Sequence, residues 1–346
     1  MKAILILLAL LPGICMAQFI LPPFNGKYPD ANLKIKITAE DGTPMSAVKV
    51  AGAFSVKEAE TLTNDQGEAE LISPSENVAG AYGILDGYYE SYTGVSFTGV
   101  KRDDPKNPRW FPWPVERTLI LRKIGNPVPL YAVENMETEM PKIGTAGFDL
   151  EKREWVAPHG SGVIPDLVFT LTRQGDETRG EATLRMSFSH PGDGFVPIYQ
   201  LNPGGSQLRF PREAPETGYQ TSWREWHWKW VNGESREELV EGEKIYQEFL
   251  KQRAKTAPPV GYFLRLRTEL DKKREVISAR YARLVCDPYR NGDMKGDFEW
   301  RPEYHTKTTM MILTYYFNPT GSRNLEFDLK KNLFKDLPGE NKPRWP

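Results

Sequence analysis

Residues 41–71 read DGTPMSAVKVAGAFSVKEAETLTNDQGEAEL and hold two strand-like segments, each preceded by a turn that contains glycine. Val48 and Val50 face one way in the first segment, because successive side chains of an extended chain point to opposite sides. Gly67 closes the second turn, and Leu71 ends the alternation that follows it. Glycine accepts the positive φ that tight turns require. The stretch therefore predicts a small β-sheet joined by tight turns.

The same alternation extends to both sides of this stretch. Residues 33–39 alternate apolar and polar side chains, as a half-buried strand does. Residues 78–100 combine tyrosine with glycine in the manner of paired strands, and residues 117–123 alternate again. We therefore predict one β-sandwich over residues 32–124, after a Pro-rich lead-in at residues 18–31.

The order of the two turn motifs resembles the carboxypeptidase regulatory-like domain, a transthyretin-like β-sandwich. The motifs are DG-x-P-x-x-x-A-V-x-V and T-L-T-N-D-x-G-x-A-x-L, and the resemblance covers residues 32–122. The matching positions are Gly42, Pro44, Ala47, Val48, Val50, Thr63, Asp65, Gly67, Ala69 and Leu71. In that family the domain is an accessory or anchoring module without catalytic residues, so the resemblance implies a supporting role.

Residues 1–17, MKAILILLALLPGICMA, have the pattern of a secretory signal peptide: an early positive charge, an apolar run and small residues. The apolar run is shorter than the about 20 residues that span a bilayer, so no membrane span is expected. Cleavage is expected after Ala17. Cys15 would be the lipidated residue of a lipoprotein, but Ile14 is large where that signal needs a small residue. The protein is therefore predicted to be secreted or periplasmic.

The composition excludes several classes of protein. The 346 residues exceed one average domain, and 39% hydrophobic with 26% charged residues is ordinary for a soluble protein. A formal net charge of −1 indicates no basic face for nucleic acid. After cleavage Cys286 is the remaining cysteine, so no internal disulfide can form. Packed cores must supply the stability, with Cys286 as a small buried hydrophobic residue.

The second half predicts a larger antiparallel β domain over residues 148–346, after a stiff Pro-rich linker at residues 125–147. Two alternating segments, 167–172 and 182–189, flank a turn at 174–176 and predict a hairpin. Further strands are expected at residues 219–231, 262–270, 274–286, 308–317 and 324–329.

One packed helix is expected near residues 235–256. Ser235 and Glu238 match a capping box, in which each side chain bonds a backbone N–H of the first turn. Pro258 then ends the helix. Strands, one helix and strands again indicate antiparallel sheets rather than βαβ units.

The last 90 or so residues resemble secreted bacterial proteins of the Verrucomicrobia–Planctomycetes type, for which no activity is assigned. The shared motifs are GDFEW at residues 296–300 and YYFNPTGSRNLEFD at residues 315–328. This resemblance implies a common architecture alone.

The sequence shows no catalytic, metal or cofactor pattern. Its histidines are His159, His190, His227 and His305, and no two of them have metal-ligand spacing. Neither a GxSxG elbow nor a phosphate-binding glycine loop is present. A hydrolase triad assembled from scattered residues stays open.

The stretch DPYRNGDMKGD at residues 287–297 resembles a calcium loop in its spacing of acidic residues. Tyr289 and Phe298, however, stand where oxygen ligands are needed. We therefore interpret Asp287, Asn291, Asp293 and Asp297 as a surface turn, with adventitious Ca²⁺ binding as the alternative.

The stretch WREWHWKWV at residues 223–231 carries alternating tryptophans. A strand would place Trp226, Trp228 and Trp230 on one face, opposite a polar face. Flat rings can stack on the apolar faces of sugars, so this face is a candidate ligand-binding surface. We favour the alternative that it forms core against the helix, because three exposed tryptophans would favour aggregation.

Trp110, Phe111 and Trp113 lie in a proline-containing loop and form a second candidate ligand-binding surface. They either pack between domains or contact a ligand or partner.

Together these features predict a secreted, non-enzymatic binding or structural protein of the bacterial envelope, with a glycan or an envelope protein as partner. The alternative is a carbohydrate-binding or carbohydrate-active module that uses exposed aromatic residues. The sequence leaves the oligomeric state open.

Overall fold

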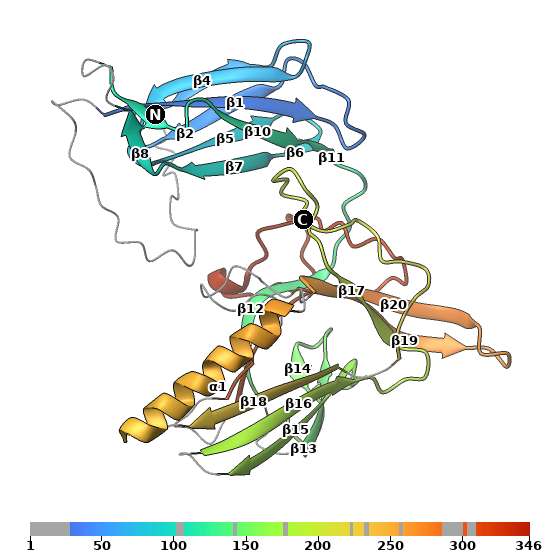
Figure 1. Ribbon diagram of the computed structural model, residues 1–346. Coiled ribbons are helices and arrows are strands. Elements are labelled where there is room, and N and C mark those ends of the chain that lie inside the picture. The colour runs from blue at the N-terminus through green and yellow to red at the C-terminus, as the bar shows by residue number, and fades with distance from the viewer. Residues whose placement is uncertain are drawn as a thin grey trace. The chain divides into compact units, whose positions relative to one another are not determined.

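The computed structural model describes residues 28–101, 107–140, 144–175, 179–221, 224–231, 235–255, 259–285, 300–302 and 309–346. Within these residues the protein consists of 22 strands, one α-helix and one short 3-10 helix (Figure 1). The predicted mainly β fold with one helix is confirmed. The signal segment, the lead-in up to residue 27, Cys286 and the acidic turn at 287–297 lie outside the described residues.

The chain forms two compact units. The N-terminal unit runs to Pro127 and also includes Leu201–Pro211 and Trp345–Pro346. The C-terminal unit comprises Val128–Gln200 and Arg212–Arg344.

The N-terminal unit contains the first half of the strands. They are β1 (Asp30–Thr38), β2 (Lys49–Phe54), β3 (Ala59–Leu62), β4 (Glu68–Pro74), β5 (Val78–Ile84), β6 (Tyr88–Tyr89), β7 (Ser91–Ser96), β8 (Gly99–Lys101), β9 (Arg109–Phe111), β10 (Val115–Ile120) and β11 (Arg122–Lys123). One sheet is centred on β1, which pairs antiparallel with β4 and parallel with β10 and β9. The other has the order β3-β2-β5-β7.

A single apolar core lies between these two sheets. Leu33, Ile35 and Ile37 of β1 are at most 1% exposed, while the lysines between them are exposed, as the alternation predicts. Val50 of β2 and Val48, two residues before it, are fully buried in the same core. Complete burial of each such side chain contributes about 1.5–3 kcal/mol, so alternation alone accounts for much of this sandwich.

Leu201–Pro211, far from this unit in sequence, joins the edges of its two sheets. The Ile120 N–H at the end of β10 donates to the Gly204 carbonyl at 3.1 Å, and the Tyr92 N–H of β7 donates to the Gly205 carbonyl at 2.9 Å. Arg122 adds a bond to the Pro203 carbonyl at 3.3 Å. The segment thus covers two strand ends that would otherwise expose unpaired backbone groups.

This contact requires glycine. Gly205 has a φ of 71°, and a Cβ there would lie 2.0 Å from the Tyr92 carbonyl oxygen. We expect Gly205→Ala to lower the free energy of unfolding by about 2–4 kcal/mol, because backbone strain and a backbone clash add. Urea denaturation measures the loss. Gly42→Ala is the control, since Gly42 has a φ of 86° with open space around it, and should cost about 1 kcal/mol from strain alone. Equal losses in both variants would contradict the proposed clash.

The C-terminal unit contains the remaining elements. They are β12 (Tyr131–Met140), β13 (Gly144–Asp149), β14 (Glu154–Trp155), β15 (Leu167–Gly175), β16 (Arg179–Ser187), β17 (Gly194–Ile198), β18 (Arg224–Val231), α1 (Arg236–Lys255), β19 (Gly261–Leu270), β20 (Val276–Val285), β21 (Trp300–Pro302), β22 (Thr309–Asn318) and the 3-10 helix η1 (Gly339–Asn341).

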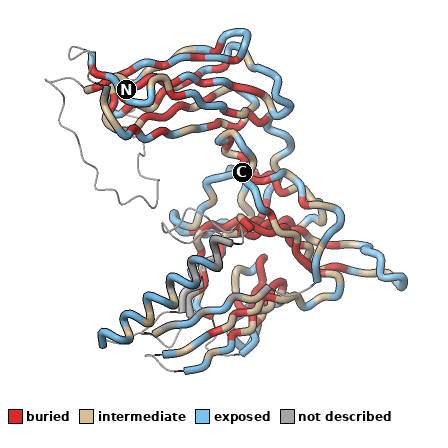
Figure 2. Tube along the Cα trace, viewed as in Figure 1, coloured by how far each residue is buried: buried red, intermediate tan, exposed pale blue. Residues whose placement is uncertain are grey.

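These strands form two sheets that bury a second core between them. One has the order β12-β22-β20-β19-β17, with β21 beside β22, and the other has the order β14-β13-β15-β16-β18. Figure 2 shows buried residues along the strands of both units, whereas the described residues of α1 are exposed or intermediate. The predicted β15–β16 hairpin is confirmed.

The helix begins as the capping box predicts. The Ser235 N–H donates to Glu238 Oε2 at 3.2 Å, and the Glu238 N–H donates to Ser235 Oγ at 3.3 Å. α1 contacts β18, the last strand of its sheet.

The predicted linker at residues 125–147 is wrong in its extent, because β12 and the start of β13 lie within it. A register shift between Val133 and Met136, with Asn135 at a φ of 54°, breaks the alternation of β12. Glu134 is a charged residue that is nevertheless buried in β12. The sequence of this segment therefore has the polar character of a linker although it forms a strand. Residues 324–329 form two isolated bridges rather than the predicted strand.

Candidate functional site: a buried ionic cluster and an exposed aromatic tip

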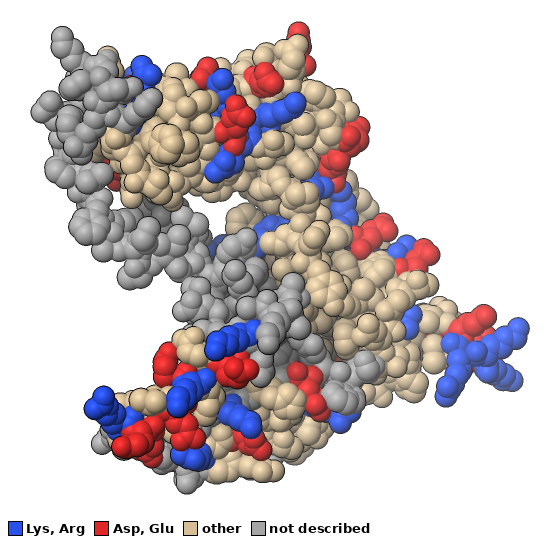
Figure 3. Space-filling model, in the orientation of Figure 1, with Lys and Arg blue, Asp and Glu red and all other residues tan. Residues whose placement is uncertain are grey.

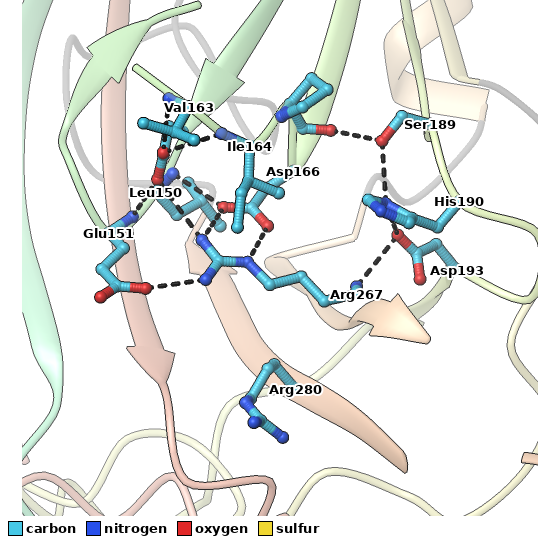
Figure 4. Close-up of polar contacts among 12 residues, drawn as sticks. Leu150, Glu151, Val163, Ile164, Asp166, Ser189, His190, Asp193, Arg267 and Arg280 are labelled. Carbon is cyan, nitrogen blue, oxygen red and sulfur yellow. Dashed lines mark hydrogen bonds and ion pairs between the residues drawn. The ribbon is translucent and has the colours of Figure 1, made fainter. Parts of the chain in front are cut away.

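A cluster of ionisable side chains in the C-terminal unit surrounds Arg267 of β19 (Figure 4). The pairing of β19 with β20 shifts register between Leu266 and Glu269, and Arg267 has a φ of 51°. Leu266 belongs to the core, and the Arg267 guanidinium lies 4.9 Å from the ring centre of the core residue Phe317. The bulge therefore turns an arginine toward the same core as its apolar neighbour.

Arg267 binds three carboxylates. Its Nε and Nη2 donate to the two oxygens of Asp166 at 2.8 and 2.9 Å, which is a forked contact. Its Nη1 donates to Glu151 at 2.7 Å, and Nη2 lies 3.4 Å from Asp149. The Asp166 side chain is fully buried and that of Arg267 is 17% exposed.

Asp149 also holds two loops through their backbone. One carboxylate oxygen accepts the N–H groups of Glu151 and Lys152, both at 3.0 Å. The other accepts those of Val163 at 2.9 Å and Ile164 at 3.0 Å. The two segments that flank the short strand β14 are thereby fastened to each other.

The charges of this cluster follow from these contacts. Burial would raise the pKa of Asp149, but the N–H groups of Ile164, Val163 and Lys152, with Arg267, hold it below its usual value. Burial raises the pKa of Asp166, and the guanidinium opposes that change. Burial would lower the pKa of Arg267, but Asp166 and Glu151 raise it, so the guanidinium stays charged.

Asp193 secures the backbone of the same bulge. Its carboxylate accepts the N–H of Thr268 at 2.8 Å and the N–H of Arg267 at 3.2 Å. Burial raises the pKa of Asp193, and the bonds from Thr268 oppose that rise.

Ser189, His190 and Asp193 lie together but do not form a catalytic triad. In a triad the hydroxyl and the carboxylate contact opposite nitrogens of the imidazole. Here Ser189 Oγ is 3.0 Å and Asp193 Oδ2 is 3.6 Å from the same atom, His190 Nδ1. Ser189 Oγ also donates to the Pro165 carbonyl at 2.7 Å. The three side chains therefore fix a loop rather than relay a proton.

Within the described ranges, no group of three or more His, Cys, Asp or Glu side chains is arranged to hold a metal ion. In the cluster itself, the Arg267 guanidinium occupies the place between carboxylates that a cation would take. The Arg267 cluster thus joins the two sheets of the unit and fixes the bulge in β19.

Trp110, a candidate ligand contact, is buried rather than exposed. It is 2% exposed, its Nε1 donates to the Ser75 carbonyl at 2.9 Å, and its ring stacks on Phe97. Phe111, the next residue of β9, is 57% exposed, because neighbouring residues of a strand point to opposite sides. Trp113 is partly exposed, with the Arg109 guanidinium 5.2 Å from its ring centre. Phe111 and Trp113, with Arg109, are the aromatic tip.

β18 sets the alternating tryptophans in register with β16. Trp226 pairs with Leu184 and Trp228 with Ala182, while Trp230 pairs with Gly180. The side chains of Trp226, Trp228 and Trp230 are outside the described part of the chain, so their binding role stays a prediction.

The opposite face of β18 is polar, as predicted. His227 Nδ1 lies 3.0 Å from Thr183 Oγ1, and Lys229 is 3.5 Å from Glu181. His159 is described but takes no part in the cluster, and His305 is not described.

Sequence reasoning missed the ionic cluster entirely. Asp166 and Asp149 are 101 and 118 positions from Arg267, so no local spacing connects them. The sequence offered one indication of the cluster, namely an acidic residue, Asp166, directly before a strongly apolar strand.

No protein-family model and no curated protein matches the chain. Solved structures that match include a 3-chlorocatechol 1,2-dioxygenase from Rhodococcus opacus, with 8% identity and a TM-score of 0.23 over 33% of this chain and 67% of that one. A DUF3823 family protein from Parabacteroides merdae has 7% identity and a TM-score of 0.19 over 69% and 89%. A streptococcal ancillary pilin has 9% identity and a TM-score of 0.20 over 79% and 63%. At such low scores these likenesses carry no argument about this chain.

The Asp149 contacts predict a pH-dependent stability. We expect Asp149→Asn to lower the free energy of unfolding at pH 7 by about 2–3 kcal/mol, because the amide nitrogen cannot accept backbone N–H groups. The folded pKa of Asp149 lies below the unfolded one, so its contribution is present above the unfolded pKa of about 3.9 and is lost as the pH falls through the folded pKa.

The difference between wild type and Asp149→Asn should therefore shrink as urea denaturation is repeated at increasingly acid pH. Asp41→Asn serves as the control, because Asp41 accepts one such bond, from the Thr43 N–H, on the open surface. Its effect should be smaller at every pH. A difference for Asp149→Asn that is unchanged by acid would contradict the assignment.

Proposed function

We propose that this chain is an exported, non-enzymatic protein of the bacterial envelope that acts by binding or by structural support. The observation that carries the proposal is the ionic cluster. The guanidinium of Arg267 bonds to the carboxylates of Asp149 and Asp166, and these carboxylates also accept backbone N–H groups. A general acid or base has to reach the proton of a substrate. The cluster is therefore suited to holding the fold together.

Export is supported by the signal pattern of residues 1–17. In the parts of the chain that the structure describes, no helix is long and apolar enough to cross a membrane. The resemblance of residues 32–122 to an accessory, transthyretin-like domain agrees with a supporting role.

A glycan is the partner that the aromatic tip fits best. Phe111 presents an exposed ring, and Arg109 holds the ring of Trp113 in place by a cation–π contact. Such rings offer flat apolar faces for stacking, at a small cost in conformational entropy. An envelope protein is the second candidate partner, because exposed aromatic residues are also common at protein interfaces.

Affinity electrophoresis of the purified protein through gels containing bacterial and plant polysaccharides tests this proposal. We expect retardation by at least one polysaccharide, without release of new reducing ends. Phe111→Ala and Trp113→Ala should each weaken binding about tenfold, since each removes a stacking ring.

Tyr199→Ala is the matched control, because Tyr199 is an aromatic residue that is 60% exposed outside the tip. It should leave retardation unchanged. New reducing ends would show catalysis and refute the non-enzymatic role, and full retardation of both tip variants would refute the assigned surface.

A further inference from the structure

The aromatic tip presents a cation beside its rings. Arg109 and Phe111 are two positions apart in β9, so both side chains leave the strand on one face, opposite the buried Trp110. Both are exposed, and their Cα atoms are separated by about 7 Å along an extended strand. A ligand that stacks on Phe111 therefore lies within reach of the Arg109 guanidinium.

The backbone position opposite Phe111 leaves its ring accessible. β8 pairs with β9 so that Gly99 lies across from Phe111. A Cβ placed on Gly99 would have no atom within 4 Å, so the space beside this position is open. A ligand can thus approach the ring from the side of β8 without displacing a side chain at residue 99.

The guanidinium of Arg109 keeps its hydrogen-bond donors available. Its Cζ lies 5.2 Å from the ring centre of Trp113, and a cation–π contact of this kind uses none of the N–H groups in the guanidinium plane. Within the described ranges no carboxylate forms an ion pair with Arg109, including that of Asp30, which pairs with Arg109 in the backbone ladder. The fork of donors is therefore free to bind an anion of the ligand.

The charges in the sequence around the tip favour an anion. Residues 99–114 contain four basic and two acidic residues, which gives a net charge of +2, namely Lys101, Arg102, Lys106 and Arg109 against Asp103 and Asp104. Including Asp30 lowers this charge to +1. Glu116, the next acidic residue along the chain, lies opposite Lys34 in the β1–β10 pair.

The rest of this unit shows no broad basic surface. Figure 3 shows lysine and arginine interspersed with aspartate and glutamate over the visible face of the N-terminal unit. Attraction of an anion to the tip must therefore come from a specific contact with Arg109 rather than from a large positive field.

We infer that the ligand of the aromatic tip is a polysaccharide that contains uronic acid, and that Arg109 binds its carboxylate. The inference rests on the proposed glycan binding and names the class of glycan. The apolar face of a uronate ring can stack on Phe111 while its carboxylate accepts two N–H groups of the guanidinium. A neutral sugar would stack equally well but would leave the guanidinium to water. A hydrogen-bonded charge of this kind changes affinity about ten- to 100-fold.

Binding to immobilised polysaccharides, measured by biolayer interferometry, tests the inference. The probes are polygalacturonate and alginate, each paired with its carboxyl-reduced form, which has the same linkages without the carboxylate. The full chain should bind at least one acidic polymer about ten to 100 times more tightly than its reduced form. Arg109→Gln should reduce this preference to within about threefold, because glutamine has neither the charge nor the fork.

Two control variants separate the carboxylate contact from other effects. Arg117→Gln removes another exposed arginine of the same unit, whose Nη1 donates to the Glu116 carbonyl at 2.9 Å, and should leave the preference unchanged. Phe111→Ala should weaken binding to the acidic and the reduced polymer alike, because it removes the stacking ring and no charge. Urea midpoints equal to that of the wild type must first show that the variants fold.

The outcomes distinguish this inference from the proposed function. A preference that persists in Arg109→Gln, or that Arg117→Gln abolishes to the same extent, would overturn the inference. Equal binding of acidic and reduced polymers, weakened in both cases by Phe111→Ala, would overturn the acidic ligand and leave glycan binding intact. Binding to dextran sulfate as tight as to the uronates, with Phe111→Ala neutral on both, would overturn it in favour of a general polyanion site. Absence of binding to every polysaccharide would remove the glycan partner and this inference together.

Discussion

The fully buried Asp166 and the largely buried Arg267, whose side chain is 17% exposed, meet between the two sheets of the C-terminal unit at nitrogen–oxygen distances of 2.8 and 2.9 Å. Removal of such charges from water is costly, and a buried ion pair compensates only when its geometry is good and its remaining lone pairs are bonded. Both conditions hold here, because the contact is forked and the Leu150 N–H donates to Asp166 at 3.0 Å. We expect this ion pair to contribute conformational specificity, because Arg267 bonds to its carboxylates in one arrangement of the surrounding loops.

Several features of the unit depend on that contact. The bulge in β19 places Arg267 over the core, and Asp193 bonds the backbone N–H groups of Arg267 and Thr268 within the bulge. Asp149 ties together the segments on either side of β14 and lies 3.4 Å from the same guanidinium. The N-terminal unit is stabilised differently, by an alternating apolar core and by the hydrogen bonds of Leu201–Pro211.

Local patterns predicted the parts of the fold that local physics determines. The alternation of β1, the β15–β16 hairpin and the capping box at Ser235 are all present, because each needs only nearby residues. β12 was not predicted, because a bulge interrupts its alternation and a glutamate stands at a buried position. Trp110 and Phe111 read as one aromatic group, yet the strand separates them into core and surface. The ionic cluster could not be predicted, since its members come together only through tertiary packing.

A double-mutant cycle between Arg267 and Asp166 tests the central claim most directly. Arg267→Met alone should lower the free energy of unfolding by about 3–5 kcal/mol, because it leaves Asp166 buried and unpaired. Asp166→Asn and the double variant complete the cycle, measured by urea denaturation at neutral pH. We predict a coupling energy of about 1–3 kcal/mol between the two positions. Losses that add to within about 0.5 kcal/mol would contradict the account, since they would mean that the two charges act independently.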